Sequence, residues 1–186
     1  MKPQRYVEVG SGYSTLFARR AIVDHRLPTQ ITSIDPEPRR RVDEVCDRVI
    51  RRRLEDVDVA LFGELEPGDV LFLDGSHRCF ANSDVCVAFL EILPALQPGV
   101  VVQIHDVFLP CDYPPSAASS YFTEQYLLAV YLMAAEGQYD IILPNAFIAA
   151  DPDLSVVLRP VWDALPTEGV RLAGASFWMT KKRAAT

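Results

Sequence analysis

Two short, almost purely apolar runs constrain the fold of this chain more than any other feature. They span residues 69–74 (DVLFLD) and 99–106 (GVVVQIHD), and neither alternates between apolar and polar residues. Strands of this composition are typical of a parallel sheet that is covered by helices on both faces. Weaker strand-like runs lie at 5–9, 31–35, 48–54, 139–143 and 175–181.

Helical segments separate most of these runs, which predicts an α/β fold. Amphipathic segments span 13–24, 82–96 and 123–137, and Pro36 and Pro38 open a short predicted helix that runs to about residue 45. This alternation favours a doubly wound, mostly parallel, Rossmann-like sheet of seven strands, with the first five in the order 3-2-1-4-5. A long connection precedes the last strand, which we expect to insert antiparallel near the edge.

The length suits a single domain spanning 1–186. In the segment 13–24, the residues that we expect to face the sheet are Leu16, Phe17, Ala21 and Ile22.

Composition excludes several classes of function. The net charge of −7 argues against a nucleic-acid partner. No window of membrane-spanning length is apolar, and the first ten residues lack the apolar run of a signal peptide. The four cysteines include no CxxC pair, which argues against a zinc knuckle or a redox pair. Scattered thiols without a secretory signal favour a reducing, cytoplasmic location.

Polar groups follow four of the predicted strands, at the point where each strand ends. These groups are Gly10–Gly12, Asp35, the stretch 74–77 (DGSH), and His105 with Asp106. Ligands of open α/β sheets bind beyond the carboxyl ends of the strands. We therefore expect these groups to meet at one edge of the sheet and to form the site.

The stretch 7–15 (VEVGSGYST) places two glycines where a strand turns into a helix. Glycine there adopts a positive φ and lets backbone approach a ligand closely. A dinucleotide site would carry GxGxxG, but Thr15 stands at the third glycine position, which weakens that interpretation. Asp35 ends the second strand, where a carboxylate can accept both ribose hydroxyls of an adenosine ligand.

Taken together, these motifs resemble those of class I S-adenosylmethionine-dependent methyltransferases. The stretch 7–15 is similar to motif I of that superfamily, and 31–38 (ITSIDPEP) is similar to its ribose-binding strand end. One branch, methyltransferase 24, resembles this chain further, at 68–77 (GDVLFLDGSH) and 96–110 (LQPGVVVQIHDVFLP). That branch includes sugar and natural-product O-methyltransferases and cephalosporin-hydroxylase-like proteins. The resemblance covers nearly the whole chain, from about residue 5 to 179.

The resemblance implies S-adenosylmethionine as the cofactor and assigns residues to it. The residues implied around the cofactor are Glu8, Gly10, Ser11 and Gly12 at the methionine part, Asp35 at the ribose, Glu55 and Asp56 near the adenine, and Asp74 at the end of the fourth strand. Relatives usually carry helices ahead of motif I, whereas about four residues precede the first strand here. We expect a domain that lacks this cover, or a second subunit that supplies it in a homo-oligomer.

The expected reaction is O-methylation of a small hydroxylated metabolite or sugar. By the same resemblance, Asp74, His105 and Asp106 occupy the places of divalent-metal ligands, and His77 occupies that of a general base. Such groups remove the acceptor proton or make the hydroxyl more acidic. Structural alternatives stay open: His105 orients Asp106, His77 bonds to backbone, and no metal binds. A non-catalytic cofactor-binding remnant and a nucleotide-dependent oxidoreductase are the alternative functions.

The segment 107–122 (VFLPCDYPPSAASSYF) is too apolar for an idle surface loop. It is predicted either to form the acceptor wall or to pack on its own domain. The helix that follows is apolar nearly all round over 126–135, which indicates deep burial or a subunit interface.

Overall fold

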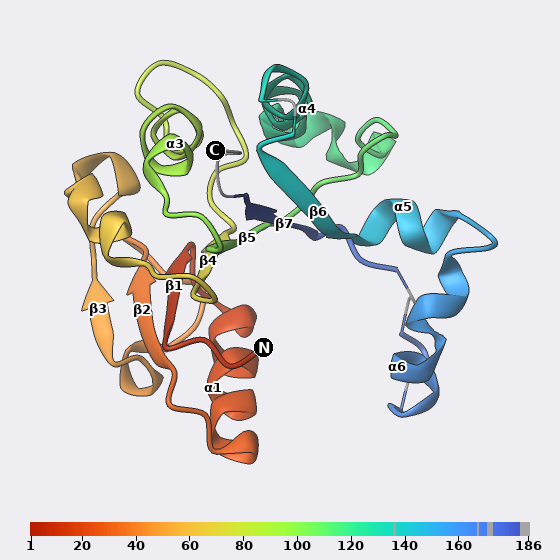
Figure 1. Cartoon of the computed structure of the whole chain (residues 1–186), viewed down its shortest axis with the longest axis horizontal. Coiled ribbons are helices and arrows are strands. Elements are labelled where there is room, and N and C mark those ends of the chain that lie inside the picture. The colour runs from red at the N-terminus through yellow and green to blue at the C-terminus, as the bar shows by residue number, and fades with distance from the viewer. Residues whose placement is uncertain (136, 167, 171–172, 183–186) are drawn as a thin grey trace.

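A single seven-stranded sheet organises the chain (Figure 1). The structure is a computed structural model of the whole chain and describes residues 1–135, 137–166, 168–170 and 173–182. In chain order the strands are β1 (Arg5–Val9), β2 (Gln30–Ile34), β3 (Arg48–Ile50), β4 (Val70–Leu73), β5 (Val101–Ile104), β6 (Tyr139–Pro144) and β7 (Phe177–Lys181).

The strand order is β3-β2-β1-β4-β5-β7-β6. The first five strands are parallel, and β7 pairs antiparallel with both β5 and β6. The predicted order and the late antiparallel strand are therefore confirmed. The third strand is shorter than predicted, since it ends at Ile50 rather than at residue 54.

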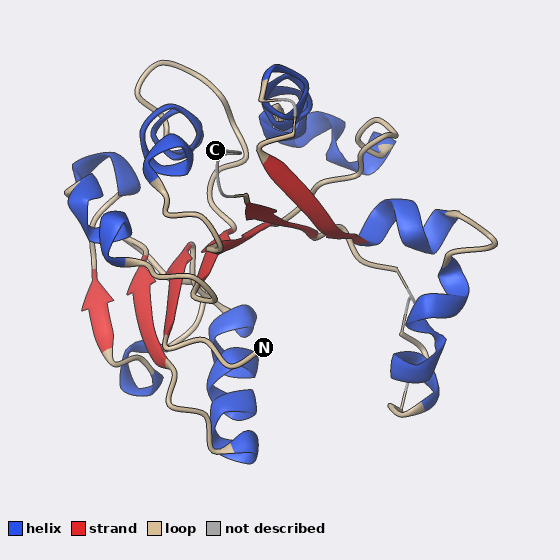
Figure 2. Cartoon of the chain, viewed as in Figure 1, coloured by secondary structure: helices blue, strands red, loops and turns tan. Residues whose placement is uncertain are grey.

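Helices cover the two faces of the sheet (Figure 2). The α-helices are α1 (Tyr13–His25), α2 (Asp84–Val87), α3 (Leu93–Ala95), α4 (Glu124–Ala134), α5 (Asn145–Ala150) and α6 (Arg159–Asp163). A π-helical stretch, η4 (Ala88–Ile92), joins α2 to α3 in one continuous helix. Short 3₁₀ turns are η1 (Asp43–Val45), η2 (Leu54–Asp56), η3 (Val59–Glu64), η5 (Pro115–Ser120) and η6 (Ser155–Leu158).

The main core lies on the face that carries α2, η4, α3 and α4. Phe89 and Leu128 from the helices are fully buried there with Val102, Ile104 and Met179 from the strands. Successive side chains of a strand point to opposite faces of the sheet, so every second residue of β5 and β7 points into this core. Helix α1 covers the opposite face, and α5 and α6 extend beyond the β6 edge (Figure 1).

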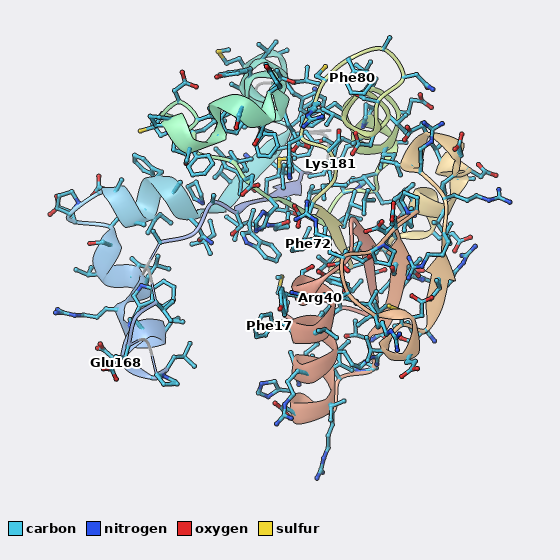
Figure 3. The ribbon with its side chains drawn as sticks, turned by 180° about the vertical axis from the view of Figure 1, so that it is seen from behind. Phe17, Arg40, Phe72, Phe80, Glu168 and Lys181 are labelled. Atoms are coloured by element: carbon cyan, nitrogen blue, oxygen red, sulfur yellow. The ribbon has the colours of Figure 1, made fainter. Side chains whose placement is uncertain are left out.

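The inner face of α1 differs from the prediction. Ile22 is buried, but Phe17 is 73% exposed and Ala21 is exposed as well. Figure 3 shows the Phe17 ring pointing away from the helix into open space. The cause is Thr15, whose hydroxyl bonds to the buried Glu8 and so turns toward the sheet. Two residues further on, about 200° around the helix, Phe17 then points to solvent.

The helix predicted after Pro36 was wrong. Residues 36–42 are irregular, and only the 3₁₀ turn η1 follows them. Asp35 and Glu37 each precede a proline, and a residue in that position is disfavoured in the α region. The two prolines therefore interrupt a helix rather than begin one.

Among the described residues, no helix combines the length and the apolar character needed to span a membrane. Helix α4 is not deeply buried, because Tyr126, Val130 and Met133 are each about half exposed or more. That leaves a subunit interface on α4 as a prediction.

Candidate active site

A cavity of about 770 Å³ opens beyond the carboxyl ends of β1, β2 and β4. The predicted site residues among its lining are Gly10, Ser11, Gly12, Asp35, Glu55, Asp74 and His105. The topology thus brings together residues from four separate strand ends, as the sheet rule anticipates. Glu8, Asp56, His77 and Asp106 were also predicted for the site but do not line this cavity.

The turn between β1 and α1 brings backbone to the floor of the cavity. Gly10 has a φ of +80°, and its N–H donates to the Ile34 carbonyl at 3.0 Å. Nothing lies within 4 Å of where a Cβ on Gly12 would stand. Gly12 therefore leaves bare backbone facing open space, which a ligand can approach closely.

Asp35 fastens this turn to the end of β2. Its two carboxylate oxygens accept from the backbone N–H groups of Ser11, at 2.7 Å, and Glu37, at 2.8 Å. The Ser11 hydroxyl lies 2.7 Å from that of Ser33. Each Asp35 oxygen retains a second lone pair, so the carboxylate can still accept from ribose hydroxyls.

Glu8 supports the turn from behind rather than lining the cavity. It is completely buried, and its carboxylate accepts from the Thr15 hydroxyl and, at 3.3 Å, from the Tyr6 hydroxyl. The Thr15 oxygen in turn accepts from the Gly12 N–H at 3.1 Å. Burial raises the pKa of Glu8, and these hydrogen bonds oppose that rise. Glu8 thus acts on the turn through Thr15.

Two acids after β3 were predicted near the adenine, and both lie beside Arg53. Glu55 lines the cavity, whereas Asp56 forms a surface ion pair with Arg53 at 3.2 Å. S-adenosylmethionine fits the resulting donor set, which offers the bare turn at Gly12, the Asp35 carboxylate and Glu55. When bound, the cofactor supplies an electrophilic methyl group on its sulfonium.

A second cluster lies where β4 and β5 end. The Nε2 atom of His77 lies 3.1 Å from Asp74 Oδ1 and 3.6 Å from Asp106 Oδ2. Potential ligand atoms of Asp74, His77 and Asp106 all fall within 4.8 Å of one another, a spacing that could hold a metal ion. The sequence prediction had His105 in this set and His77 as a separate base.

His105 stands at the edge of the cluster. Its Nδ1 atom lies 3.2 Å from Asp106 Oδ1 and 3.5 Å from Asp74 Oδ1, but neither contact has the direction of a hydrogen bond. The Asp106 carboxylate raises the pKa of His105, and His105 lowers that of Asp106. His105 also lines the cavity, so it faces both the cofactor space and the cluster.

The charge state of His77 follows from its three carboxylate neighbours. Burial alone would lower its pKa, but hydrogen bonds to Asp74 and Glu124 raise the pKa of His77 to about 10. At neutral pH it therefore carries a proton on both ring nitrogens. A general-base role, as predicted, requires His77 first to give up its Nε2 proton.

Sequence reasoning missed Glu124, which lies 2.8 Å from His77 Nδ1 and is buried. An acid in the first turn of a helix ordinarily indicates pairing with the helix dipole. Because 47 residues separate it from His77, no short-range pattern connects the two.

The apolar segment 107–122 packs on the main core through Val107 and Leu109, and its aromatic rings pack on one another and on His77. The Phe122 ring lies 4.7 Å from the His77 ring, and Tyr113 lies 5.8 Å from Phe122. Of the residues in this segment whose side chains the structure describes, none lines the cavity of about 770 Å³. This arrangement favours the second of the two predictions, packing on its own domain.

A comparison with protein families identifies one that matches this chain. The methyltransferase 24 family model, described as a methyltransferase domain, matches residues 7–107. No curated protein matches the chain significantly.

Solved structures resemble it at low identity. A putative S-adenosylmethionine-dependent methyltransferase from Listeria monocytogenes is 13% identical, with 97% of this chain and 91% of that chain covered and a TM-score of 0.45. The 16S rRNA (adenine(1408)-N(1))-methyltransferase from Catenulisporales acidiphilia is also 13% identical, with coverages of 98% and 89% and a TM-score of 0.46. The structure of a fibrillarin/Nop5p complex is 16% identical, with 98% of this chain and 74% of that chain covered and a TM-score of 0.44.

The family match spans more than half of the chain and includes the turn at Gly10, Asp35, Asp74 and Asp106. The chain belongs to the methyltransferase 24 family and is a class I S-adenosylmethionine-dependent methyltransferase.

Proposed function

We propose that this methyltransferase transfers the methyl group of S-adenosylmethionine to a hydroxyl oxygen of a small metabolite or sugar. The observation that carries the proposal is the double role of Asp74. It lines the cofactor cavity and also belongs to the carboxylate–imidazole cluster with His77 and Asp106. An acceptor bound at this cluster would lie beside the cofactor.

A hydroxyl acceptor needs help that this cluster is suited to give. An alcohol is a weak nucleophile until its proton is removed or its pKa is lowered. The carboxylates of Asp74 and Asp106 can accept hydrogen bonds from the hydroxyl and hold it in line with the methyl group. As the bond from the methyl carbon to oxygen forms and its bond to sulfur breaks, Asp106 would take the hydroxyl proton and S-adenosylhomocysteine would leave. Positioning of this kind accounts for much of the acceleration expected in a transfer between two bound reactants.

The cluster also suits a divalent cation. Two carboxylates and one imidazole form a mixed donor set, which favours manganese, iron or zinc over magnesium. Asp74, Asp106 and His77, once its Nε2 proton is released, would hold such a cation, which would make a bound hydroxyl more acidic. His105, which the sequence predicted as the ligand beside Asp74 and Asp106, lies at the edge of this set.

The test is methyl transfer from S-adenosylmethionine to a panel of sugars, phenols and hydroxy acids, detected as the mass gain of one methyl group. We expect a product on oxygen, and at least about a 100-fold loss in Asp106→Asn, the size of a missing acid–base contribution. Asp140→Asn, which alters an exposed acid beside Lys182, is the matched control and should keep full activity. Transfer that survives both Asp74→Asn and Asp106→Asn, or a product only on nitrogen, would refute the proposal. Chelation of the sample reports separately on the metal.

A further inference from the structure

Helix α4 provides a buried carboxylate, Glu124, that contacts the cluster of Asp74, His77 and Asp106 through His77. Glu124 is 4% exposed and His77 is 5% exposed, and Oε2 of the first lies 2.8 Å from Nδ1 of the second. The other ring nitrogen, Nε2, faces Asp74 and Asp106. The imidazole therefore bridges α4 and the ends of β4 and β5.

Backbone contacts fix the same two segments to each other. The N–H groups of Thr123 and Glu124 both donate to the His77 carbonyl, at 2.8 and 3.1 Å. The Cys79 N–H donates to the Thr123 hydroxyl at 2.7 Å. The start of α4 thus holds residues 77–79 at three points besides the side-chain bond.

The conformation of His77 requires such support. Its φ is +58°, in the left-handed region that a residue with a Cβ rarely adopts. The Phe122 ring, 4.7 Å away, packs on the imidazole and restricts its rotation. With Phe122 against the ring and Glu124 at Nδ1, Nε2 is directed at the carboxylate pair.

Burying a carboxylate costs more free energy than burying an apolar side chain that fills the same space. Glu124 is 4% exposed, and the His77 imidazole is the partner that offsets the cost of its burial. A buried ion pair is weak evidence for stability, because well-packed apolar residues of similar volume serve as well or better. Its presence beside the cluster is better explained if the carboxylate orients the imidazole. Carboxylates orient histidines in this way at metal sites.

We propose that Glu124 is a positioning residue, which holds the His77 ring with Nε2 toward Asp74 and Asp106. This inference rests on the proposed function, since it assigns to that cluster the residue that orients it. Glu124 touches neither the cofactor cavity nor the carboxylate pair and acts only through His77.

Three variants separate positioning from folding. Glu124→Leu removes the acceptor of the Nδ1–H bond, whereas Glu124→Gln keeps the shape and one acceptor oxygen. Gln125→Leu is the matched control, because Gln125 is the adjacent buried residue and bonds to the Phe108 N–H, at 2.8 Å, instead of to His77. Thermal unfolding of all three, beside the wild type, shows how much each loses in stability.

The first readout is the ring N–H resonance of His77 in a nitrogen-15 NMR spectrum of the full chain, which has only three histidines. We expect a slowly exchanging Nδ1–H signal in the wild type and in Gln125→Leu, a weakened signal in Glu124→Gln, and none in Glu124→Leu. An unchanged signal in Glu124→Leu overturns the proposal, whatever the acceptor or the metal proves to be.

The second readout is function. Loss of an outer partner of this kind typically costs about 10–100-fold in metal affinity or activity. For Glu124→Leu we expect a loss of that size either in the affinity for Mn²⁺ or in kcat, while the KM for S-adenosylmethionine changes by no more than about two-fold. Glu124→Gln should recover part of the loss. Equal losses in Glu124→Leu and Gln125→Leu would show a merely structural role. A wild type that binds no Mn²⁺ and methylates no hydroxyl would refute the proposed function, while the ring resonance still decides the role of Glu124.

Discussion

Gly10 lies directly against the backbone of Asp74, so that a Cβ on Gly10 would stand only 1.8 Å from the Asp74 carbonyl oxygen. The Asp74 N–H also donates to the Val9 carbonyl at 2.8 Å. The turn that faces the cofactor and the strand end that carries the acidic cluster are therefore in direct contact. A change in one is expected to displace the other.

Gly10→Ala should consequently impair both stability and cofactor binding. A positive φ costs a residue with a Cβ about 1–2 kcal/mol, and the contact with the Asp74 backbone adds to that cost, because backbone cannot rotate away. We expect a lower melting temperature and weaker S-adenosylmethionine binding by calorimetry. Gly63→Ala is the control, since no atom lies within 4 Å of its Cβ position, its φ is not positive, and it lies outside the cavity. Equal effects of the two substitutions would contradict this account.

Asp35→Ala should weaken cofactor binding with a smaller effect on the fold. The substitution leaves the Ser11 and Glu37 N–H groups without their acceptor and removes the predicted ribose contact. We expect S-adenosylmethionine affinity to fall by about 1–3 kcal/mol, the usual cost of unpaired polar groups. Titration calorimetry measures it, and unchanged affinity would remove Asp35 from the cofactor site.

Much of the fold was predictable because strands β4 and β5 have a strong local signal. Their apolar runs can only be central strands, and the polar residues that follow them then share one edge. The same rule placed Asp35, Asp74 and His105 around one cavity correctly. These inferences need only the order of elements along the chain.

The failures depend on contacts between distant segments. Phe17 was predicted to be buried because periodicity ignores the hydroxyl of Thr15, which fixes the rotation of α1. Glu124 was missed because its partner His77 is brought near only by tertiary packing. The prediction placed His105 with Asp74 and Asp106, whereas the group whose spacing could hold a metal ion contains His77, and the left-handed backbone of His77 is invisible in the sequence.

Thr15→Val should destabilise the protein although the two side chains have nearly the same shape. The hydroxyl links the buried Glu8 carboxylate to the Gly12 N–H, and valine leaves both without that partner. We expect the free energy of unfolding to fall by about 1–3 kcal/mol, the penalty for buried unsatisfied groups. Urea denaturation measures it, with Thr15→Ser as the control that keeps the hydroxyl. If Thr15→Val is as stable as Thr15→Ser, Glu8 has another means of support.

Asp47 should make the stability of the protein depend on pH in the acid range. Its Oδ2 atom accepts from the Ile31 N–H at 2.7 Å and from Arg19 at 2.5 Å, which ties β2 to α1. Burial by itself would raise the pKa of Asp47, but these two donors hold it below its usual value. A carboxyl whose folded pKa is depressed contributes stability fully above the unfolded pKa, about 3.9, and loses that contribution as the pH falls through the folded pKa.

Asp47→Asn should therefore be less stable than the wild type at pH 7, and the difference should shrink as the pH falls below about 4. Urea unfolding at pH 7 and at successively lower pH measures the difference. Asp24→Asn is the control, because among the described residues Asp24 pairs with Arg20 alone, at 2.7 Å on the exposed surface of α1. Exposed pairs contribute about 0–1 kcal/mol, so this variant should track the wild type at every pH. A constant difference for Asp47→Asn across the range would mean that its carboxylate contributes through shape alone, and that the ionised form gains nothing from Arg19 or the Ile31 amide.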